Sequence, residues 1–120
     1  MCEESRNCST VRPRQLYNWH MFVITLRYTA PLDQLDTHMG EHMKFLRKYY
    51  QQNIFLTSGR QVPRVGGIIL AQAKSKELMQ AIMEEDPFCK NGLAEFTVTE
   101  FLNSQMHPAF KKMMTALSGE

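Results

Sequence analysis

The sequence predicts an α+β domain with an antiparallel sheet and helices on one face of that sheet. Short stretches of alternating apolar residues predict four strands, and apolar residues at three- and four-residue intervals predict helices between them. Along the chain these elements follow the order β-α-β-β-α-β, with an extra helix at the C-terminal end. This order is typical of the ferredoxin-like split β-α-β arrangement.

Length and composition limit the function classes. The 120 residues make one domain, which we divide into an N-terminal extension (1–19), a main domain (20–103) and a C-terminal helix (104–120). The net charge of +2 argues against a nucleic-acid partner, and no apolar run approaches the roughly 20 residues of a membrane span. Cys2, Cys8 and Cys89 show no metal-type spacing, so we expect reduced thiols and a cytoplasmic protein.

The first strand and the first helix have the clearest patterns. Residues 20–29 alternate, with Phe22, Ile24 and Leu26 on one face. A helix is expected over 33–52, with Asp33 as its N-cap. Its apolar stripe consists of Leu35, Met39, Phe45, Leu46 and Tyr49. Gly40, which lowers helix propensity, indicates a close approach there by another element, a partner or a ligand.

The remaining elements follow from turn and cap residues. Strands are expected over 54–58, which Gly59 ends, over 67–73, buried on both faces, and over 95–102. Ser75 is expected to cap a helix over 76–85, which ends before Pro87, and residues 88–92 are expected to form a loop. The inward residues of that helix are Leu78, Met79, Ile82 and Met83. Pro108 suits the first turn of a last helix, in which Phe110, Met113, Met114 and Leu117 share a face.

The sheet face opposite the helices is also expected to be apolar. The residues assigned to it are Val23, Thr25, Phe55, Ile69 and Phe101. Such a face is too apolar to remain in water, so we expect a second subunit to pack there, in a homodimer or a multiple of one.

One ionisable residue lies in the apolar stripe of the first helix. At about 100° per residue, His42 falls between Met39, Phe45 and Leu46. One interpretation is a core histidine bonded to a backbone carbonyl. The other is an acid/base or nucleophilic group in a cleft.

A carboxylate that could pair with His42 lies at the end of the second helix. Glu84, Glu85 and Asp86 are acidic residues where the helix macrodipole disfavours negative charge, and such local conflicts often indicate function. If the helices are neighbours, Asp86 can fix the tautomer of His42 and leave its other ring nitrogen free to move a proton. A solvated acidic helix end beside an unrelated core histidine is the alternative.

Three further groups give weaker signals. His38 and His42 have the i, i+4 spacing of metal ligands, but no third ligand is evident, so no metal is expected. Arg60 and Arg64, with the glycines beside them, could hold an anionic substrate or form a solvated basic loop. Cys89 has no paired base and is expected to be an inert thiol.

Several stretches resemble the YCII-related (YciI-like) family. The resemblance covers about residues 21–102 and lies in Glu41-His42-Met43-Lys44-Phe45-Leu46, Leu56-Thr57-Ser58-Gly59, Gly66-Gly67, Glu85-Asp86-Pro87-Phe88 and Gly92-Leu93. It implies a dimeric α+β barrel with His42 and Asp86 in a cleft. Some relatives are lyases or isomerases of ring compounds, including a dehydrochlorinase of a chlorinated hydroxyhydroquinone. Many members have Pro after Ser58-Gly59, where this sequence has Arg60.

Three functional hypotheses follow. The first is an enzyme of lyase, isomerase or dehydrochlorinase type, with His42 as general acid/base and Asp86 as its orienting carboxylate, acting without a cofactor on a small anionic or phenolic substrate. The residues expected to contact the substrate are Ser58, Gly59, Arg60 and Phe88. The second hypothesis is a non-catalytic ligand-binding or interaction module that uses the same cleft. The third, by analogy of fold alone, is a cofactor-free quinol oxygenase.

Overall fold

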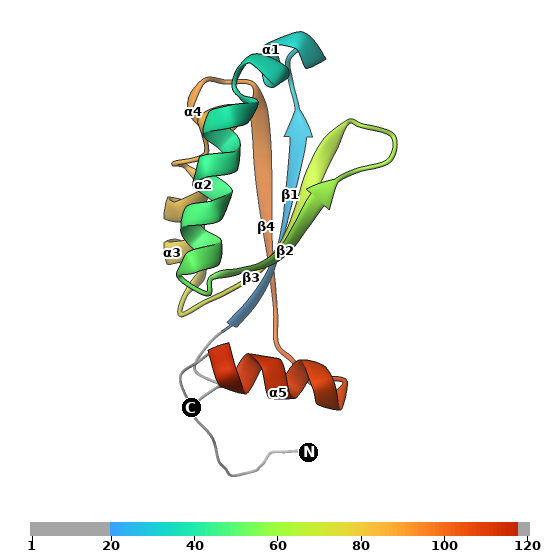
Figure 1. Ribbon diagram of the computed structural model, residues 1–120, viewed down its shortest axis with the longest axis vertical. Coiled ribbons are helices and arrows are strands. Elements are labelled where there is room, and N and C mark those ends of the chain that lie inside the picture. The colour runs from blue at the N-terminus through green and yellow to red at the C-terminus, as the bar shows by residue number, and fades with distance from the viewer. Residues whose placement is uncertain (1–19, 118–120) are drawn as a thin grey trace. The chain divides into compact units, whose positions relative to one another are not determined.

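The computed structural model describes residues 20–117, which belong to two compact units (Figure 1). One unit is His20–Leu102, and residues 103–117 belong to the other. The predicted extension over 1–19 lies outside the described residues. None of the helices within residues 20–117 is long and apolar enough to span a membrane.

The sheet has four antiparallel strands in the order β2-β3-β1-β4. These are β1 (His20–Tyr28), β2 (Phe55–Arg60), β3 (Gly66–Ala73) and β4 (Ala94–Phe101). The central strands β1 and β3 pair over eight residues, from His20 opposite Ala73 to Arg27 opposite Gly66. This topology confirms the predicted ferredoxin-like α+β fold, with β2 and β4 at the two edges.

This unit has four helices, of which the last three lie on one side of the sheet and the first lies across the end of β1 (Figure 1). They are α1 (Leu32–Thr37), α2 (Met39–Gln51), α3 (Lys76–Met83) and α4 (Pro87–Lys90). The extra helix, α5 (Pro108–Leu117), belongs to the other unit. Of the four residues predicted to share a face of this helix, Met114 is buried, Phe110 and Leu117 are half-buried, and Met113 is exposed.

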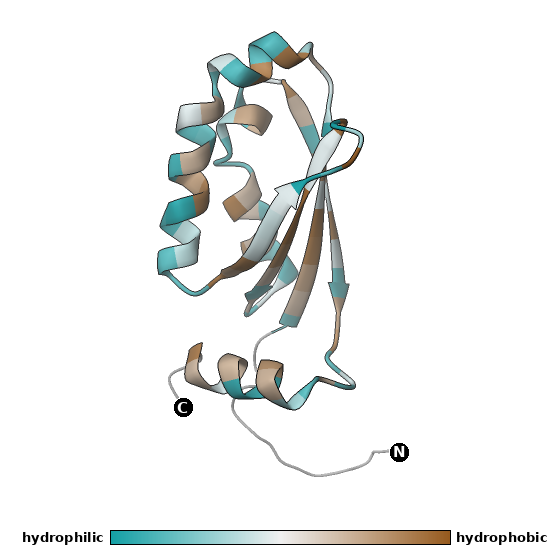
Figure 2. Ribbon diagram, turned by 45° about the vertical axis from the view of Figure 1, so that its right-hand side comes forward, coloured by the Kyte–Doolittle hydropathy of each residue, from teal (hydrophilic) through white to brown (hydrophobic). Residues whose placement is uncertain are grey.

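The core lies between the sheet and the helices. Figure 2 shows hydrophobic residues concentrated along the middle of the sheet and alternating with hydrophilic residues along α2. The buried side chains of the sheet include Phe22, Ile24, Leu26, Phe55 and Ile69. Those of the helices include Phe45, Leu46 and Tyr49 from α2 and Met79, Ile82 and Met83 from α3. The predicted inward position of Leu78 is wrong, because this side chain is 42% exposed.

The outer face of the sheet, opposite α2 and α3, differs from the prediction at two positions. Ile69 pairs with Ile24 of the core, so it points toward the helices, and its neighbours Ile68 and Leu70 point outward. Phe55 pairs with Ala71, which places it in the core as well. Phe55 faces the core because the β2–β3 pairing has a register shift between Phe55 and Thr57, which the sequence pattern does not reveal. The outer face therefore carries Val23, Thr25, Ile68, Leu70 and Phe101.

The predicted helix over 33–52 is two helices. The chain leaves the helical conformation at His38 (φ −101°, ψ 7°), which ends α1 and begins α2. Asp33 is not the N-cap, because the extended Pro31 precedes the helix and the Asp33 carboxylate accepts from the adjacent Gln34 N–H at 3.0 Å. Within residues 20–117 no other element of the chain approaches Gly40 closely, since a Cβ there would have no heavy atom of another element within 4 Å.

The segment around Asp86 is also more regular than predicted. The Ser75 hydroxyl caps α3 by accepting from the Leu78 N–H at 3.1 Å, as expected, but α3 ends at Met83. The predicted loop over 88–92 contains the short helix α4, which has Asp86 as its N-cap and Pro87 in its first turn. An Asp at N-cap followed by Pro at N1 is a typical helix start, so Asp86 and Pro87 begin α4 after the turn at 84–85 that follows α3.

The β2–β3 hairpin brings Arg60 into the sheet. The prediction that Gly59 ends the strand is wrong, because β2 continues to Arg60, which pairs with Gly67. Gly66, at the start of β3, is required by close packing, since a Cβ there would lie 1.8 Å from the Leu26 carbonyl oxygen. The absence of a side chain at Gly66 therefore lets the hairpin lie close to β1, beside the site described next.

Candidate functional site

His42 lies in the first turn of α2 on the face that packs against the core. Its side chain is buried, with 8% of the residue exposed. The imidazole stacks on the Phe88 ring, with centroids 4.1 Å apart and planes 7° from parallel. Two helices therefore fix this ring, since α2 supplies the histidine and α4 supplies the surface on which it rests.

The hydrogen-bond partner of His42 is Asp86, which is fully buried at the start of α4. The Asp86 Oδ1 atom lies 2.8 Å from the His42 Nδ1 atom and accepts the Phe88 N–H at 3.1 Å. Because an ionised carboxylate can only accept hydrogen bonds, Nδ1 of His42 carries the proton and donates it. The lone pair of the neutral ring then lies on Nε2.

The second oxygen of Asp86 is unusual. Oδ2 is buried and has no hydrogen-bond donor within residues 20–117. A buried carboxylate with one unmatched oxygen is costly for the fold unless a positive charge can form beside it. The negative charge of Asp86 can stabilise the imidazolium that His42 becomes when it takes up a proton.

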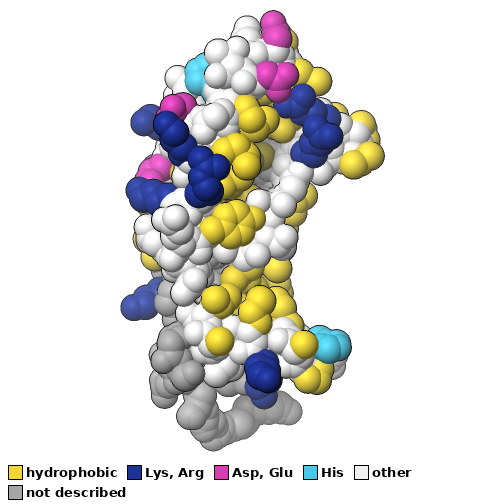
Figure 3. Space-filling view, viewed as in Figure 1, with side chains coloured by type: hydrophobic (Ala, Val, Ile, Leu, Met, Phe, Trp, Pro, Cys, Tyr) yellow, Lys and Arg dark blue, Asp and Glu magenta, His cyan; other side chains and the backbone are white. Residues whose placement is uncertain are grey.

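The imidazole borders a cavity of about 310 Å³ between α2, α4 and the sheet. Most of its wall is apolar, with side chains of Leu26, Met39, Met43, Leu46, Ile69 and Phe88. Figure 3 shows hydrophobic side chains gathered in the hollow between α2 and the β2–β3 hairpin, with Lys and Arg side chains at both rims. A cavity of this size and character suits a small organic molecule with a flat apolar body.

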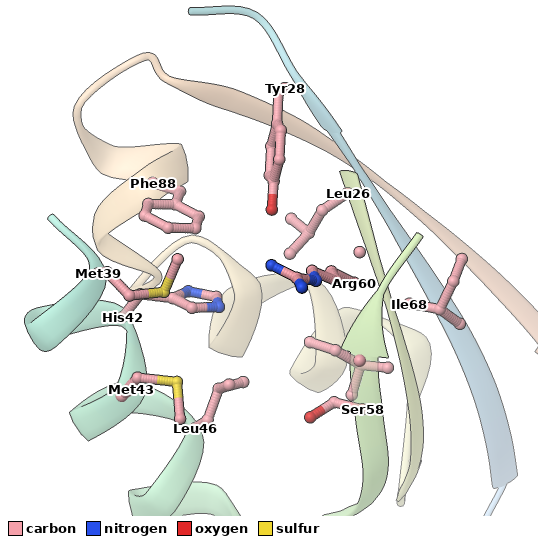
Figure 4. Close-up of a pocket in the computed structure, with 13 residues that line it drawn as sticks. Leu26, Tyr28, Met39, His42, Met43, Leu46, Ser58, Arg60, Ile68 and Phe88 are labelled. Carbon is pink, nitrogen blue, oxygen red and sulfur yellow. The ribbon is translucent and has the colours of Figure 1, made fainter. Parts of the chain in front are cut away.

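Four polar side chains face this cavity. They are Tyr28, His42, Ser58 and Arg60. In Figure 4 the edge of the His42 imidazole, the Tyr28 hydroxyl and the Arg60 guanidinium point into the same space. The Ser58 hydroxyl is held by the Tyr50 hydroxyl at 2.5 Å. Polar groups at separate points of an apolar wall can orient a ligand that has several oxygen atoms.

The two arginines of the hairpin have different environments. Arg64 forms an ion pair with Asp36 at 2.6 Å, and this hydrogen bond raises the pKa of the Arg64 guanidinium. Arg60 has no carboxylate partner within residues 20–117, although it lines the cavity. Among the described residues that line the cavity, Arg60 is the one Lys or Arg side chain, and its guanidinium can pair with an anionic ligand.

All the predicted substrate contacts lie on the cavity wall. Ser58, Gly59, Arg60 and Phe88 line it together with His42, and Asp86 lies behind His42. Sequence reasoning missed Tyr28, although the alternation of the first strand places it on the same face as Leu26. Its position at the end of that strand, where the sheet meets the helices, was the available signal.

The other predicted groups do not join the site. His38 Nδ1 lies 3.2 Å from the Gln34 carbonyl oxygen, and no three His, Cys, Asp or Glu side chains of the described part of the chain gather as metal ligands would. Burial raises the pKa of the Cys89 thiol to about 12, so this cysteine is protonated at neutral pH and a poor nucleophile.

Comparisons with known proteins agree with this fold. Residues 21–102 match the YCII-related domain. Among solved structures, the 5-chloro-2-hydroxyhydroquinone dehydrochlorinase TftG from Burkholderia phenoliruptrix, in complex with 2,5-dihydroxybenzoquinone, is similar with a TM-score of 0.56 and 17% identity, over 75% of this chain and 97% of that one. The cofactor-independent oxygenase SnoaB from Streptomyces nogalater is similar with a TM-score of 0.46 and 12% identity, over 75% and 97%. No curated protein matches the sequence.

Proposed function

The chain belongs to the YCII-related domain family, and we propose that it is a small cofactor-independent enzyme that performs acid/base chemistry on a single-ring substrate. The substrate class is an anionic or phenolic ring compound, and the reaction is an elimination or isomerisation. One observation carries the proposal: the buried His42, hydrogen-bonded to the buried Asp86 carboxylate, borders an apolar cavity that is also lined by Arg60, which has no carboxylate partner within residues 20–117.

His42 is the proposed general base and general acid. The Nδ1–H···Oδ1 bond to Asp86 fixes the tautomer, so Nε2 can take a proton from a ring hydroxyl in the cavity. Asp86 stabilises the imidazolium that results. Arg60 is placed to stabilise the oxyanion left on the ring.

The proposed elimination balances without an oxidant. The O–H bond of a ring hydroxyl breaks, its proton moves to His42, and His42 delivers this proton to the ring carbon that bears the leaving group. The oxyanion thereby becomes a carbonyl. Loss of a second hydroxyl proton then expels the leaving group as an anion, so the net change is loss of HX.

The cavity wall supports binding of a ring. The side chains of Phe88 and Met39 provide apolar surface, and Ser58 and Tyr28 provide hydroxyl groups that can bond ring oxygens. The fold of TftG, whose name records elimination of chloride from a hydroxylated ring, makes chlorinated hydroquinones the first compounds to test.

A turnover screen tests the proposal. The protein would be mixed with chlorinated and unchlorinated hydroquinones, catechols and hydroxybenzoates without oxygen, and halide release and ultraviolet absorbance would be followed. We expect turnover of at least one ring compound, with no added metal or cofactor. If ring compounds raise the melting temperature of the protein but are not converted, the protein is a ligand-binding module and not an enzyme.

A further inference from the structure

A second polar contact joins α2 to the segment that carries Asp86. The Glu85 carboxylate accepts the Tyr49 hydroxyl at 2.7 Å, and the Lys48 ammonium lies 3.2 Å from the same oxygen. The Lys48 ammonium also lies 5.0 Å from the centre of the Tyr49 ring. Glu85 directly precedes Asp86, so two adjacent residues of the α3–α4 junction are both bonded to α2.

Tyr49 is a firm point of attachment. It is only 5% exposed, and its ring contacts those of Phe45 and Phe55, with centroids 5.4 Å and 5.5 Å away. It follows His42 by two helical turns on the buried face of α2, about 10 Å along the helix axis. Because the ring is held by its neighbours, the position of its hydroxyl is held too.

The charges at this contact are complementary. The hydrogen bond from Tyr49 lowers the pKa of the Glu85 carboxyl below its usual value. Burial, and then the hydrogen bond to Glu85, raise the pKa of Tyr49. At neutral pH a neutral hydroxyl therefore donates to an ionised carboxylate, which is a strong kind of hydrogen bond.

We propose that Tyr49 and Glu85 are positioning residues for the His42–Asp86 pair. The junction between α3 and α4 is short, and the N–H groups of Glu85 and Asp86 bond the carbonyl oxygens of Ile82 and Met83 at 3.0 and 3.1 Å. Such a segment moves as a unit. The Tyr49–Glu85 bond holds this unit against α2, and thereby sets the distance between the His42 and Asp86 side chains.

The proposal has a catalytic consequence that rests on the proposed function. A shift of about 1 Å in a catalytic group can cost as much as about 100-fold in rate. Removing the Tyr49 hydroxyl is therefore expected to lower kcat about 10- to 100-fold and to leave KM nearly unchanged, because neither Tyr49 nor Glu85 lines the cavity.

The closing experiment observes the pair directly and needs no substrate. In protein labelled with ¹⁵N-histidine, the Nδ1 proton of His42 is expected to give a downfield resonance, assigned by its loss in His42→Ala. We expect Tyr49→Phe and Glu85→Ala to broaden or shift this resonance and to speed its exchange with water. Glu85→Ala keeps the test valid if Tyr49→Phe does not fold, because the Glu85 side chain is 49% exposed.

A matched control is Ser75→Ala, which removes the N-cap at the other end of α3 and destabilises the helix without touching the junction. It should leave the His42 resonance unchanged. A resonance that is unchanged in Tyr49→Phe and Glu85→Ala would overturn the proposal. A changed resonance in a protein that turns over no ring compound would support the positioning role and contradict the proposed function.

Discussion

Asp86 Oδ1 accepts two hydrogen bonds with different consequences. The bond from the Phe88 N–H starts α4, whereas the bond from His42 fixes the imidazole. Asparagine caps helices about as well as aspartate, so Asp86→Asn should keep α4 while it weakens control of the tautomer. We expect turnover to fall about 10²- to 10⁴-fold with little change in melting temperature. Asp86→Ala should lose about 1 kcal/mol more stability through the missing cap. Full activity in Asp86→Asn would contradict the role assigned to the carboxylate.

The two hairpin arginines allow a test of substrate charge. Arg60 faces the cavity without a carboxylate partner within residues 20–117, and Arg64 is bonded to Asp36. A hydrogen bond to a charged group contributes about 1.5–3 kcal/mol, so Arg60→Gln should weaken the binding of anionic ring compounds roughly 10- to 100-fold. Isothermal titration with a hydroxybenzoate and a neutral phenol measures the effect. Arg64→Gln is the control, and an equal loss in both variants would show that Arg60 does not contact the anion.

At the scale of the elements, two glycines have opposite requirements. A Cβ at Gly66 would lie 1.8 Å from the Leu26 carbonyl oxygen, whereas a Cβ at Gly40 would meet nothing within 4 Å. We expect Gly66→Ala to cost more than about 2 kcal/mol of unfolding free energy, because backbone must move. Gly40→Ala in α2 should stabilise by about 0.5 kcal/mol. Urea unfolding measures both, and a stable Gly66→Ala protein would show that the hairpin lies farther from β1.

The helical period was enough to predict which face of α2 is buried, and so to place His42 against the core. The same reasoning could not find the break at His38, because the apolar stripe continues through it. It also could not assign the outward residues of β3. Ile68, Ile69 and Leu70 are all apolar, so there is no alternation to show which of them face the helices. The bulge in β2 also leaves no pattern in the sequence from which it could be predicted.

The pairing of His42 with Asp86 could be anticipated only in part. The topology places both helices on one sheet face, which allows the contact, and the conflict of acidic residues with the helix end made Asp86 a candidate. The distance depends on α4, whose start at Asp86 orients the carboxylate. The place of Tyr28 in the cavity wall, and the lack of a carboxylate partner for Arg60 among the described residues, depend on side-chain packing, which a sequence pattern does not specify.

At the scale of the whole molecule, the outer face of the sheet predicts self-association. Ile68 and Phe101 are 37% and 40% exposed there, and Leu70 lies between Val23 and the edge strand. We expect light scattering at micromolar concentration to give twice the mass of one chain. Leu70→Lys should shift the mass toward that of one chain, and Lys44→Glu, an exposed change on α2, should not. If the wild-type protein has the mass of one chain, the predicted dimer is wrong.

We propose that His42 is present for chemistry and not for packing. The direct measurement is the turnover of His42→Ala on a ring compound that the wild-type protein converts, made together with its free energy of unfolding. The loss of the imidazole enlarges an existing space but also leaves the buried Asp86 carboxylate without its side-chain donor, so about 3–5 kcal/mol of unfolding free energy should be lost. Turnover should fall about 10²- to 10⁴-fold. Turnover within threefold of the wild type, in a variant that still folds, would show that His42 is a core residue and not a catalytic one.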